Sequence, residues 1–308
     1  MNRKLYFPII LRQPSPHIWI SIGELSQLPA SGPAWNNLKE RADEVADTPN
    51  LGDQDNEVNI TILAKALVFA RTGQAGYRSD VVAALRVIAT HNTENSDSNP
   101  MLSVSRQLVA YVISADLVSL PEYDPSLDAQ FRAKLRELLT ENFDSDPGDV
   151  DTLQTMHERR PNNWGTHAGA SRAALAIYLG DAAELERTAQ VFKGWLGDRS
   201  AYAGFHFNDD LSWQADPNNP VAVNPLGAVI QGFPVDGAMP DEMRRGCSFQ
   251  WPPCYTHYAW GGLQGAVVQA EILSRAGYPV WQWQDSAMLR AVQFLYLINW
   301  PATDDDQW

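Results

Sequence analysis

Residues 102–120 read LSVSRQLVAYVISADLVSL, and their apolar side chains recur every three or four positions. This spacing places an apolar stripe along one face of a helix, whereas a half-buried strand would alternate apolar and polar residues. Similar stripes recur along the chain, and no convincing strand-like alternation accompanies them. The sequence predicts helices over Glu57–Thr72, Tyr77–Thr93, Leu102–Leu120, Phe131–Phe143, Asn163–Leu179, Ala182–Leu196, Tyr258–Ala276 and Gln284–Ile298.

Helices of similar length joined by short turns favour an all-α fold of paired antiparallel helices, stacked as an α/α toroid. We expect one such domain over residues 1–308. One stretch, Gly197–Pro240, breaks the rhythm because it is rich in Gly, Pro, Asn and Asp. Loops of this length are usually functional or disordered, and the aromatic residues within this one argue against disorder. We therefore predict an ordered loop over a cleft.

The net charge of −14 argues against a nucleic-acid partner, because binding a phosphate backbone needs concentrated Lys and Arg. An anionic substrate would likewise need arginines gathered locally. The adjacent pairs Arg159–Arg160 and Arg244–Arg245 are the candidates. No apolar run approaches the roughly 18 residues that a membrane-spanning helix needs, so no membrane partner is expected.

The start of the chain, Met1–Ile10, does not read as a signal peptide, because Pro8 breaks its apolar stretch and Arg12 and Pro14 soon follow. Both a cytoplasmic location and a secreted one, with the leader absent, stay open. The two cysteines, Cys247 and Cys254, are close enough to form a disulfide, and free thiols remain an equal alternative. No zinc-ligand spacing occurs, and no metal or other cofactor is expected.

Three blocks in the second half concentrate residues suited to chemistry. Residues 160–167, RPNNWGTH, place two asparagines, a tryptophan and a histidine at the start of a predicted helix. An asparagine there is an ordinary N-cap. However, Asn163 and His167 are four residues apart and share a helix face, and the helix end offers N–H groups suited to a carboxylate.

The second block begins at the end of the long loop, and the third follows it. Residues 236–246 read DGAMPDEMRRG, in which Glu242 and Arg245 have the spacing of an ordinary surface ion pair. Residues 251–260 read WPPCYTHYAW and lead directly into a predicted helix. Aromatic clusters are more often core than active site, but so many polar tips fit poorly into a sealed core.

In order and spacing these blocks resemble the alginate lyases of the mannuronate-specific, single-domain type. Asn162–Asn163 matches their paired asparagines, Glu242-x-x-Arg245 their middle motif and residues 255–259 their Tyr-His-Asn-Tyr-Ala segment. The likeness extends over roughly residues 55 to 300 and includes a possible glucuronan-type branch. Trp164 stands where the family has histidine, so either His167 or His257 would supply that function.

The resemblance implies β-elimination of a uronic-acid polymer, with unsaturated products, by a secreted or periplasmic enzyme. It implies Asn163 as neutraliser of the substrate carboxylate, His167 as second neutraliser or base, Arg245 as orienting residue and Tyr255 as base and acid. A longer gap after Arg245 makes Tyr258 a competitor for Tyr255. The expected substrate-binding residues are Arg160, Asn162, Trp164, Trp213, Glu242, Trp251 and His257.

Two other classes of function remain open from the sequence. A glycoside hydrolase on the same fold would need two carboxylates flanking the bond, and candidates lie in or near the loop: Asp209, Asp210, Asp236, Asp241 and Glu242. A non-catalytic glycan-binding toroid would bind without turnover. Unsaturated products would distinguish the lyase from both. Which uronate is cleaved, and at which position in the polymer, depends on the cleft.

Overall fold

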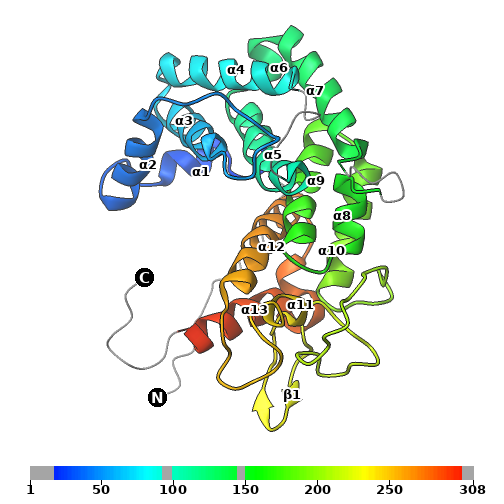
Figure 1. The fold of residues 1–308 in the computed structure, drawn as a ribbon. Helices are drawn as coiled ribbons and strands as arrows, with labels where there is room; N and C mark the ends of the chain where they lie inside the picture. Colours follow the sequence, from blue (N-terminus) through cyan, green and yellow to red (C-terminus); the bar gives the residue numbers. More distant parts are fainter. Residues whose placement is uncertain (1–16, 92–98, 144–149, 300–308) are drawn as a thin grey trace.

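Two buried helices, α5 (Pro100–Leu117) and α9 (Asn163–Leu179), form the centre of the structure, a computed structural model that describes residues 17–91, 99–143 and 150–299 (Figure 1). Their residues are apolar or small on almost every side, which allows a helix to be surrounded by others. α3 (Val58–Thr72) packs against α5, and α12 (His257–Arg275) packs against α9. The row α3, α5, α9, α12 therefore contains the core.

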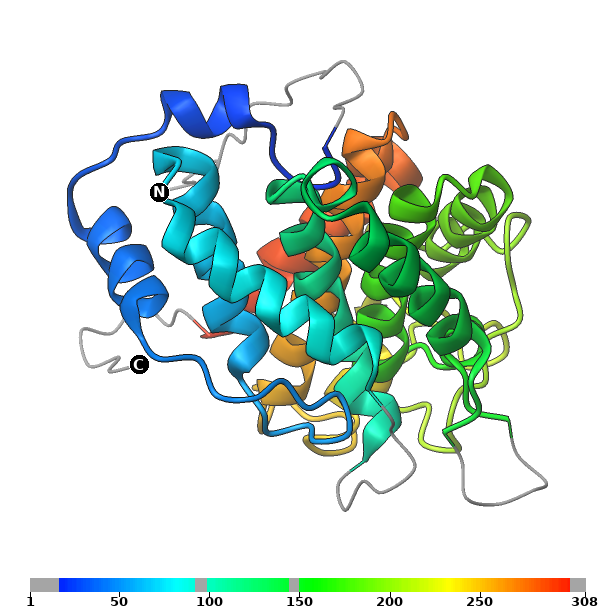
Figure 2. The ribbon, with the colours of Figure 1, turned by 90° about the horizontal axis from the view of Figure 1, so that it is seen from above.

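The remaining helices cover this row. α2 (Pro33–Asp43) and α4 (Ala75–Ala89) pack on α3, α7 (Pro125–Thr140) packs on α4, and α8 (Leu153–Arg159) and α10 (Ala182–Trp195) pack on α9. In Figure 2 the N-terminal helices lie on one side of α5 and helices α7 to α10 on the other. The all-α prediction is confirmed, whereas closure into a toroid stays a prediction.

Close contacts between helices depend on small residues. The Ser171 hydroxyl of α9 donates to the Ser105 carbonyl at 2.8 Å and accepts from the Val109 amide at 3.0 Å, so it lies across one turn of α5. Between α9 and α12, a Cβ on Gly265 would stand 2.7 Å from the His167 amide nitrogen. Such an approach is tighter than side chains allow, and it fixes the ends of α9 and α12 together.

The predicted helix boundaries agree best where the caps are strong. α9 begins at Asn163 after its Asn162 cap and ends at Leu179, because Gly180 adopts the left-handed conformation. The predicted helix to Leu120 divides into α5 and the short α6 (Leu120–Tyr123). α13 (Trp283–Asn299) opens with a left-handed turn over residues 284–286. The predicted helix end at Thr93 and the segment Met1–Ile10 lie outside the described residues.

The sequence did not predict the short elements: α1 (Ile22–Gln27), α2, α8, α11 (Pro240–Met243), the 3₁₀ turn Val280–Gln282, and the hairpin of β1 (Val229–Ile230) and β2 (Phe233–Pro234). The hairpin and α11 belong to the long loop or its end, and Figure 1 places them at one end of the molecule. None of the helices in the described ranges is long and apolar enough to cross a membrane.

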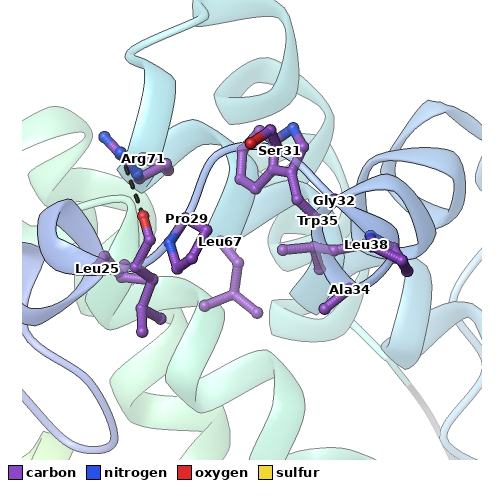
Figure 3. Close-up of a pocket in the computed structure, with 11 residues that line it drawn as sticks. Leu25, Pro29, Ser31, Gly32, Ala34, Trp35, Leu38, Leu67 and Arg71 are labelled. Atoms are coloured by element: carbon purple, nitrogen blue, oxygen red, sulfur yellow. Dashed lines mark hydrogen bonds between the residues drawn. The ribbon is translucent and has the colours of Figure 1, made fainter.

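An apolar pocket of about 310 Å³ lies between α1, α2 and α3 (Figure 3). Leu25, Trp35 and Leu67 line it, and Arg71 at its edge donates to the Leu28 carbonyl. None of the residues predicted to bind or cleave substrate lines this pocket. The candidate site must therefore be sought where the three sequence blocks meet.

Candidate active site

The N-terminus of α9 is held by side chains from within the protein. The Asn162 Oδ1 atom accepts a hydrogen bond from the Trp164 amide at 3.2 Å, and its Nδ2 atom donates to Asp241 of α11 at 3.1 Å. Asn162 is buried, so both of its polar groups are occupied. Asn162 is thus the N-cap of α9, and its predicted contact with substrate stays a prediction.

Glu242 of α11 joins the same helix end. One carboxylate oxygen accepts from the Asn163 amide, and the other accepts from Arg245 Nη1 at 3.2 Å. The side chain is 1% exposed, and this burial raises its pKa to about 7 even though Arg245 and the Asn163 amide act in the opposite direction. Glu242 was predicted to bind substrate, and in this buried position its carboxylate holds the Asn163 amide and Arg245.

The Glu242 contact also corrects the expectation of a free helix end. The amides of residues 163 and 164 are taken by Glu242 and Asn162, so they are not available to a substrate carboxylate. A carboxylate at this end is favourable in itself, because it faces the positive end of the helix dipole. A substrate at this helix end would therefore meet side chains more readily than these two amides.

Three of the predicted residues converge beside this helix end. Arg245 Nη1 donates to Asn163 Oδ1 at 2.8 Å, and the guanidinium carbon lies 3.7 Å from the centre of the Tyr258 ring. Because Asn163 accepts through its oxygen, its amide nitrogen stays oriented as a donor. The structure thus assembles an amide, a guanidinium and a phenol from α9, the segment after α11, and α12.

His167 lies one turn further along α9. Its side chain is 8% exposed, and its Nε2 atom has no hydrogen-bond partner among the described residues. Burial, with a smaller contribution from the charge of Arg106, lowers the pKa of His167 to about 3. The imidazole is therefore neutral at physiological pH, which agrees with a hydrogen-bonding function and not with a cationic neutraliser.

Arg106 of α5 is the residue that the sequence analysis missed. It is half-buried, and its charge acts on His167, Arg245 and Glu242, so it belongs to the same cluster. A signal was present in the sequence, because Arg106 and Asp116 are the only charged residues between positions 102 and 119. A charge within an otherwise apolar helix requires an explanation.

The two tyrosines differ in their surroundings. Tyr258 is partly buried beneath Arg245, whereas Tyr255 is 68% exposed, ahead of α12. His257, the first residue of α12, is also exposed and lies between them, with ring centres 6.2 Å from Tyr255 and 4.4 Å from Tyr258. The contacts connect Tyr258 with Asn163 through Arg245, whereas Tyr255 has no hydrogen bond or ring contact with either residue.

The predicted tryptophans have different positions. Trp213 is 1% exposed, packs edge-on against Phe249 and donates to the Cys247 carbonyl, so its ring offers almost no surface to a polymer. Trp251 is partly exposed and stacks on Phe233 of the hairpin at 5.2 Å. Trp164 packs partly against the core. Only Trp251 among the three combines an accessible ring with the loop region.

An exposed arginine and a disulfide lie next to the group formed by Asn163, Arg245 and Tyr258. Arg160, which was predicted to bind substrate, is exposed at the end of α8 and next to the α9 start. Cys247 and Cys254 form a disulfide that closes the segment between Arg245 and Tyr255. The bridge therefore limits how far the arginine and the tyrosines can separate.

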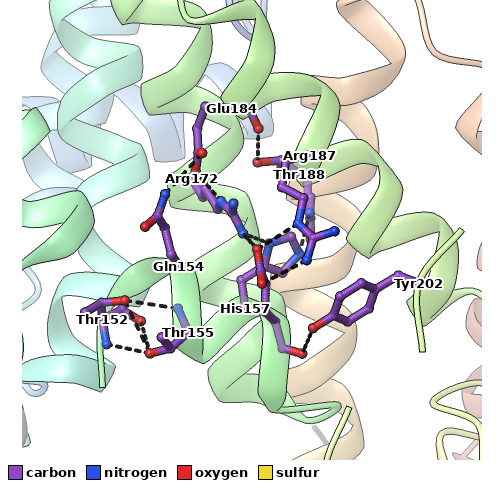
Figure 4. Close-up of polar contacts among 11 residues, drawn as sticks. Thr152, Gln154, Thr155, His157, Arg172, Glu184, Arg187, Thr188 and Tyr202 are labelled. Atoms are coloured by element: carbon purple, nitrogen blue, oxygen red, sulfur yellow. Dashed lines mark hydrogen bonds and ion pairs between the residues drawn. The ribbon is translucent and has the colours of Figure 1, made fainter. Parts of the chain in front are cut away.

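A buried ion network lies behind the site, between α8, α9, α10 and α12 (Figure 4). Arg172 of α9 is almost fully buried and pairs with Glu158 and Glu184. His157 lies 3.4 Å from Arg172 and 3.0 Å from Gln269, and burial lowers its pKa well below the ordinary value. This network holds α9 through Arg172, on a part of the helix away from Asn163.

In the described part of the chain, no group of three or more His, Cys, Asp or Glu residues could hold a metal ion. A family model described as alginate lyase matches residues 39–206. No curated protein matches the chain. The matched range contains Arg106, Asn163 and His167, whereas Arg245 and both tyrosines lie beyond it. Because the match covers more than half of the sequence, the chain is a polysaccharide lyase that belongs to the alginate lyase family.

Proposed function

We propose that this lyase cleaves a uronic-acid polymer, polymannuronate or glucuronan, by β-elimination and leaves 4,5-unsaturated ends. The observation that carries the proposal is the contact of Arg245 with both Asn163 and the Tyr258 ring. Elimination requires a group that neutralises a carboxylate and a group that accepts the C5 proton. Asn163 can supply the first and Tyr258 the second, and Arg245 contacts both. The family match supports the reaction class but does not identify the polymer.

In the proposed reaction the deprotonated tyrosine oxygen takes the proton from C5 of the sugar, and negative charge develops on the neighbouring carboxylate. The donor face of Asn163, which Arg245 orients, stabilises this charge, and such stabilisation is the usual source of large rate effects in such sites. The electron pair left at C5 then forms the C4=C5 double bond as the C4–O bond breaks, and the leaving oxygen, which keeps the pair of that bond, receives the proton from the tyrosine.

The contacts favour Tyr258 over Tyr255 as this base. Tyr258 lies against Arg245, and Arg245 bonds Asn163, so the three groups can act on one sugar. The resemblance in sequence instead matches Tyr255 to the catalytic position. The Tyr255 side chain is exposed and lies two residues before the start of α12. Single Tyr-to-Phe variants distinguish the two assignments.

A hydrolase mechanism receives less support because four of its five candidate carboxylates are bonded within the protein, and only Asp209 is exposed without a bond to a described residue. Glu242 and Asp241 are buried and bonded to the start of α9. Asp236 pairs with Arg290 of α13 and accepts from the Gly227 amide. An inverting or retaining pair needs two carboxyl groups open to the same glycosidic bond, and these residues do not offer one.

The disulfide supports a location in an oxidising compartment. Disulfides persist outside the cytoplasm and in the periplasm, and they are rare where thiol reductants are present. We therefore infer secretion or export to the periplasm, which also gives access to a large polymer. Detection of the protein in the periplasmic or extracellular fraction with the bridge intact would test this inference.

The proposed activity is tested with a panel of polymannuronate, polyguluronate, glucuronan and glycosaminoglycans. Cleavage is followed by the ultraviolet absorbance of the new double bond and by reducing ends in parallel. We expect both signals to rise together on one of the uronans. Reducing ends without absorbance would identify a hydrolase, and binding without either signal would identify a glycan-binding protein.

A further inference from the structure

Arg106 carries a charge that nothing in the described structure neutralises directly. The guanidinium is half-buried and makes no hydrogen bond or ion pair with a described residue. Burial is the main reason why its pKa is lowered, and the charge of Arg245 adds to the effect. A partly desolvated charge without a partner is costly, so such a residue is retained where a ligand supplies the opposite charge.

The nearby carboxylates do not fill this role. Glu242 is engaged by Arg245 and by the Asn163 amide. Asp55 is exposed in the loop before α3 and forms no ion pair with Arg106. Since ionised Glu242 balances Arg245, Arg106 supplies the excess positive charge of the cluster in that state.

The position of Arg106 is fixed by its neighbours on α5. Ser105 and Val109 both bond the Ser171 hydroxyl of α9, so the turn that carries Arg106 is tied directly to α9. His167 lies one turn before Ser171 on the same face of α9. Arg106 and His167 therefore lie along the same contact between α5 and α9, and the charge of Arg106 acts on the imidazole.

His167 provides a second, independent observation. Its Nε2 atom is buried and lacks a partner, while the ring has a hydrogen-bonding contact with the backbone of Gly261. Buried polar atoms are almost always bonded, and an exception within a site points to a missing ligand atom. An unpaired guanidinium beside an unpaired imidazole nitrogen fits a group that combines a carboxylate with a hydroxyl, as a uronate does.

We propose that Arg106 binds the carboxylate of the uronate whose C5 proton is removed, and that His167 Nε2 hydrogen-bonds the same sugar. This inference rests on the proposed function. It adds that Arg106 provides the net positive charge of the candidate active site. Arg245, balanced by Glu242, then mainly orients Asn163 and the tyrosine. Arg106 is the cation that offsets the charge developing on the substrate.

The test compares Arg106→Gln, Arg106→Lys and the control Arg136→Gln, which also removes one positive charge but lies exposed on α7. Each variant is assayed for kcat and KM on the uronan that the wild type cleaves. Each is also titrated with a short uronate oligomer and with its carboxyl-reduced, neutral counterpart. Melting temperatures are measured without saccharide.

We expect Arg106→Gln to lose about 10- to 100-fold in kcat/KM, the usual effect of removing a charge-assisted hydrogen bond. It should also lose the preference for the acidic over the neutral oligomer. Its melting temperature should equal or exceed that of the wild type, because no protein contact is broken. Arg106→Lys should retain part of the preference, and Arg136→Gln should behave as the wild type.

Three outcomes would overturn the inference: unchanged kcat/KM, an unchanged acid-to-neutral preference, or a melting temperature several degrees lower in both Arg106 variants. The last would assign Arg106 a structural function. If the wild type releases no unsaturated product from any uronan, the proposed function fails separately. The oligomer titrations would then still decide whether Arg106 recognises a carboxylate.

Discussion

Arg245 donates from Nη1 to Oδ1 of Asn163 at 2.8 Å, although the two residues are 82 positions apart in the chain. The bond turns the Asn163 carbonyl toward the arginine and leaves its NH₂ group as the donor for a ligand. Arg245 also covers the Tyr258 ring, so one guanidinium sets the orientation of two candidate catalytic groups. The buried Glu242 holds this guanidinium from behind.

Replacing Asn163 by Ala should lower kcat by about 100- to 1000-fold, because a preorganised donor aimed at the developing charge is lost. The matched control is Asn162→Ala, which removes the N-cap and should cost about 1 kcal/mol of stability while the activity of the folded protein is largely kept. Initial rates well below the melting temperature separate the two effects. Equal loss of kcat in both variants would contradict the distinction between cap and catalytic amide.

Replacing Tyr258 by Phe should abolish turnover, because the ring and its packing under Arg245 remain while the hydroxyl that carries the proton is removed. Tyr255→Phe should retain most of the activity. Both variants should still bind the polymer, as measured by titration under conditions without turnover. The reverse result would restore Tyr255 as the base, and full activity in both would exclude a tyrosine base at either position.

Glu242 should make both activity and stability depend on pH. Its pKa is raised from 4.5 to about 7 in the folded state, so the folded protein binds a proton more readily than the unfolded chain between these values. The stability contributed by this proton is present below pH 4.5 and is lost as pH rises through about 7, with a slope of about 1.4 kcal/mol per pH unit at most. Activity should rise over the same range as Glu242 ionises and orients Arg245.

The Glu242→Gln variant tests both effects. It should become more stable relative to the wild type as pH rises from 5 to 8, since it carries no buried charge. Its kcat should be about tenfold lower, because Arg245 loses a charge-assisted partner, and it should lack the rise near pH 7. Melting curves and kcat profiles over pH provide the measurements, and parallel profiles for the two proteins would show that another group titrates.

The disulfide should stabilise the segment that separates Arg245 from the tyrosines. Closing a loop of this size stabilises a protein by about 2 kcal/mol. Cys247→Ser combined with Cys254→Ser should lose this amount, measured by denaturant unfolding, and kcat should fall with it. A thiol reductant should reproduce the loss in the wild type and leave the double variant unchanged. A response of the double variant to the reductant would show that its target is not this bridge.

The sequence predicted the long helices well because their boundaries are local. Asn162 caps α9, Gly180 ends it, and an apolar pattern fills the space between. α2 has few apolar residues, and α8 and α11 are too short for a periodic pattern, so tertiary packing decides their conformation. A short turn cannot be recognised from periodicity alone.

The candidate site was predicted only in part, because contacts between distant segments are not encoded locally. The Glu242 and Arg245 spacing fits an exposed ion pair, yet Glu242 is buried against the start of α9. Trp213 suited a sugar platform by residue type, but the fold buries it under the disulfide loop. Arg106 lay within an apolar stripe, and only the packing of α5 on α9 places it beside His167.

The ion network behind the site should make the protein sensitive to acid through His157. Burial holds the pKa of His157 well below its ordinary value of 6.5, so the unfolded chain takes up a proton that the folded protein excludes. The resulting stability is present above pH 6.5 and is lost as pH falls, by about 1.4 kcal/mol per pH unit.

His157→Gln keeps a hydrogen-bonding group beside Gln269 and cannot be protonated. Between pH 6.5 and 5 the variant should therefore lose less stability than the wild type, measured by denaturant unfolding at each pH. His206→Gln, on the long loop, is the control and should retain the wild-type slope. Identical slopes in the wild type and His157→Gln would show that His157 does not resist protonation in the folded protein.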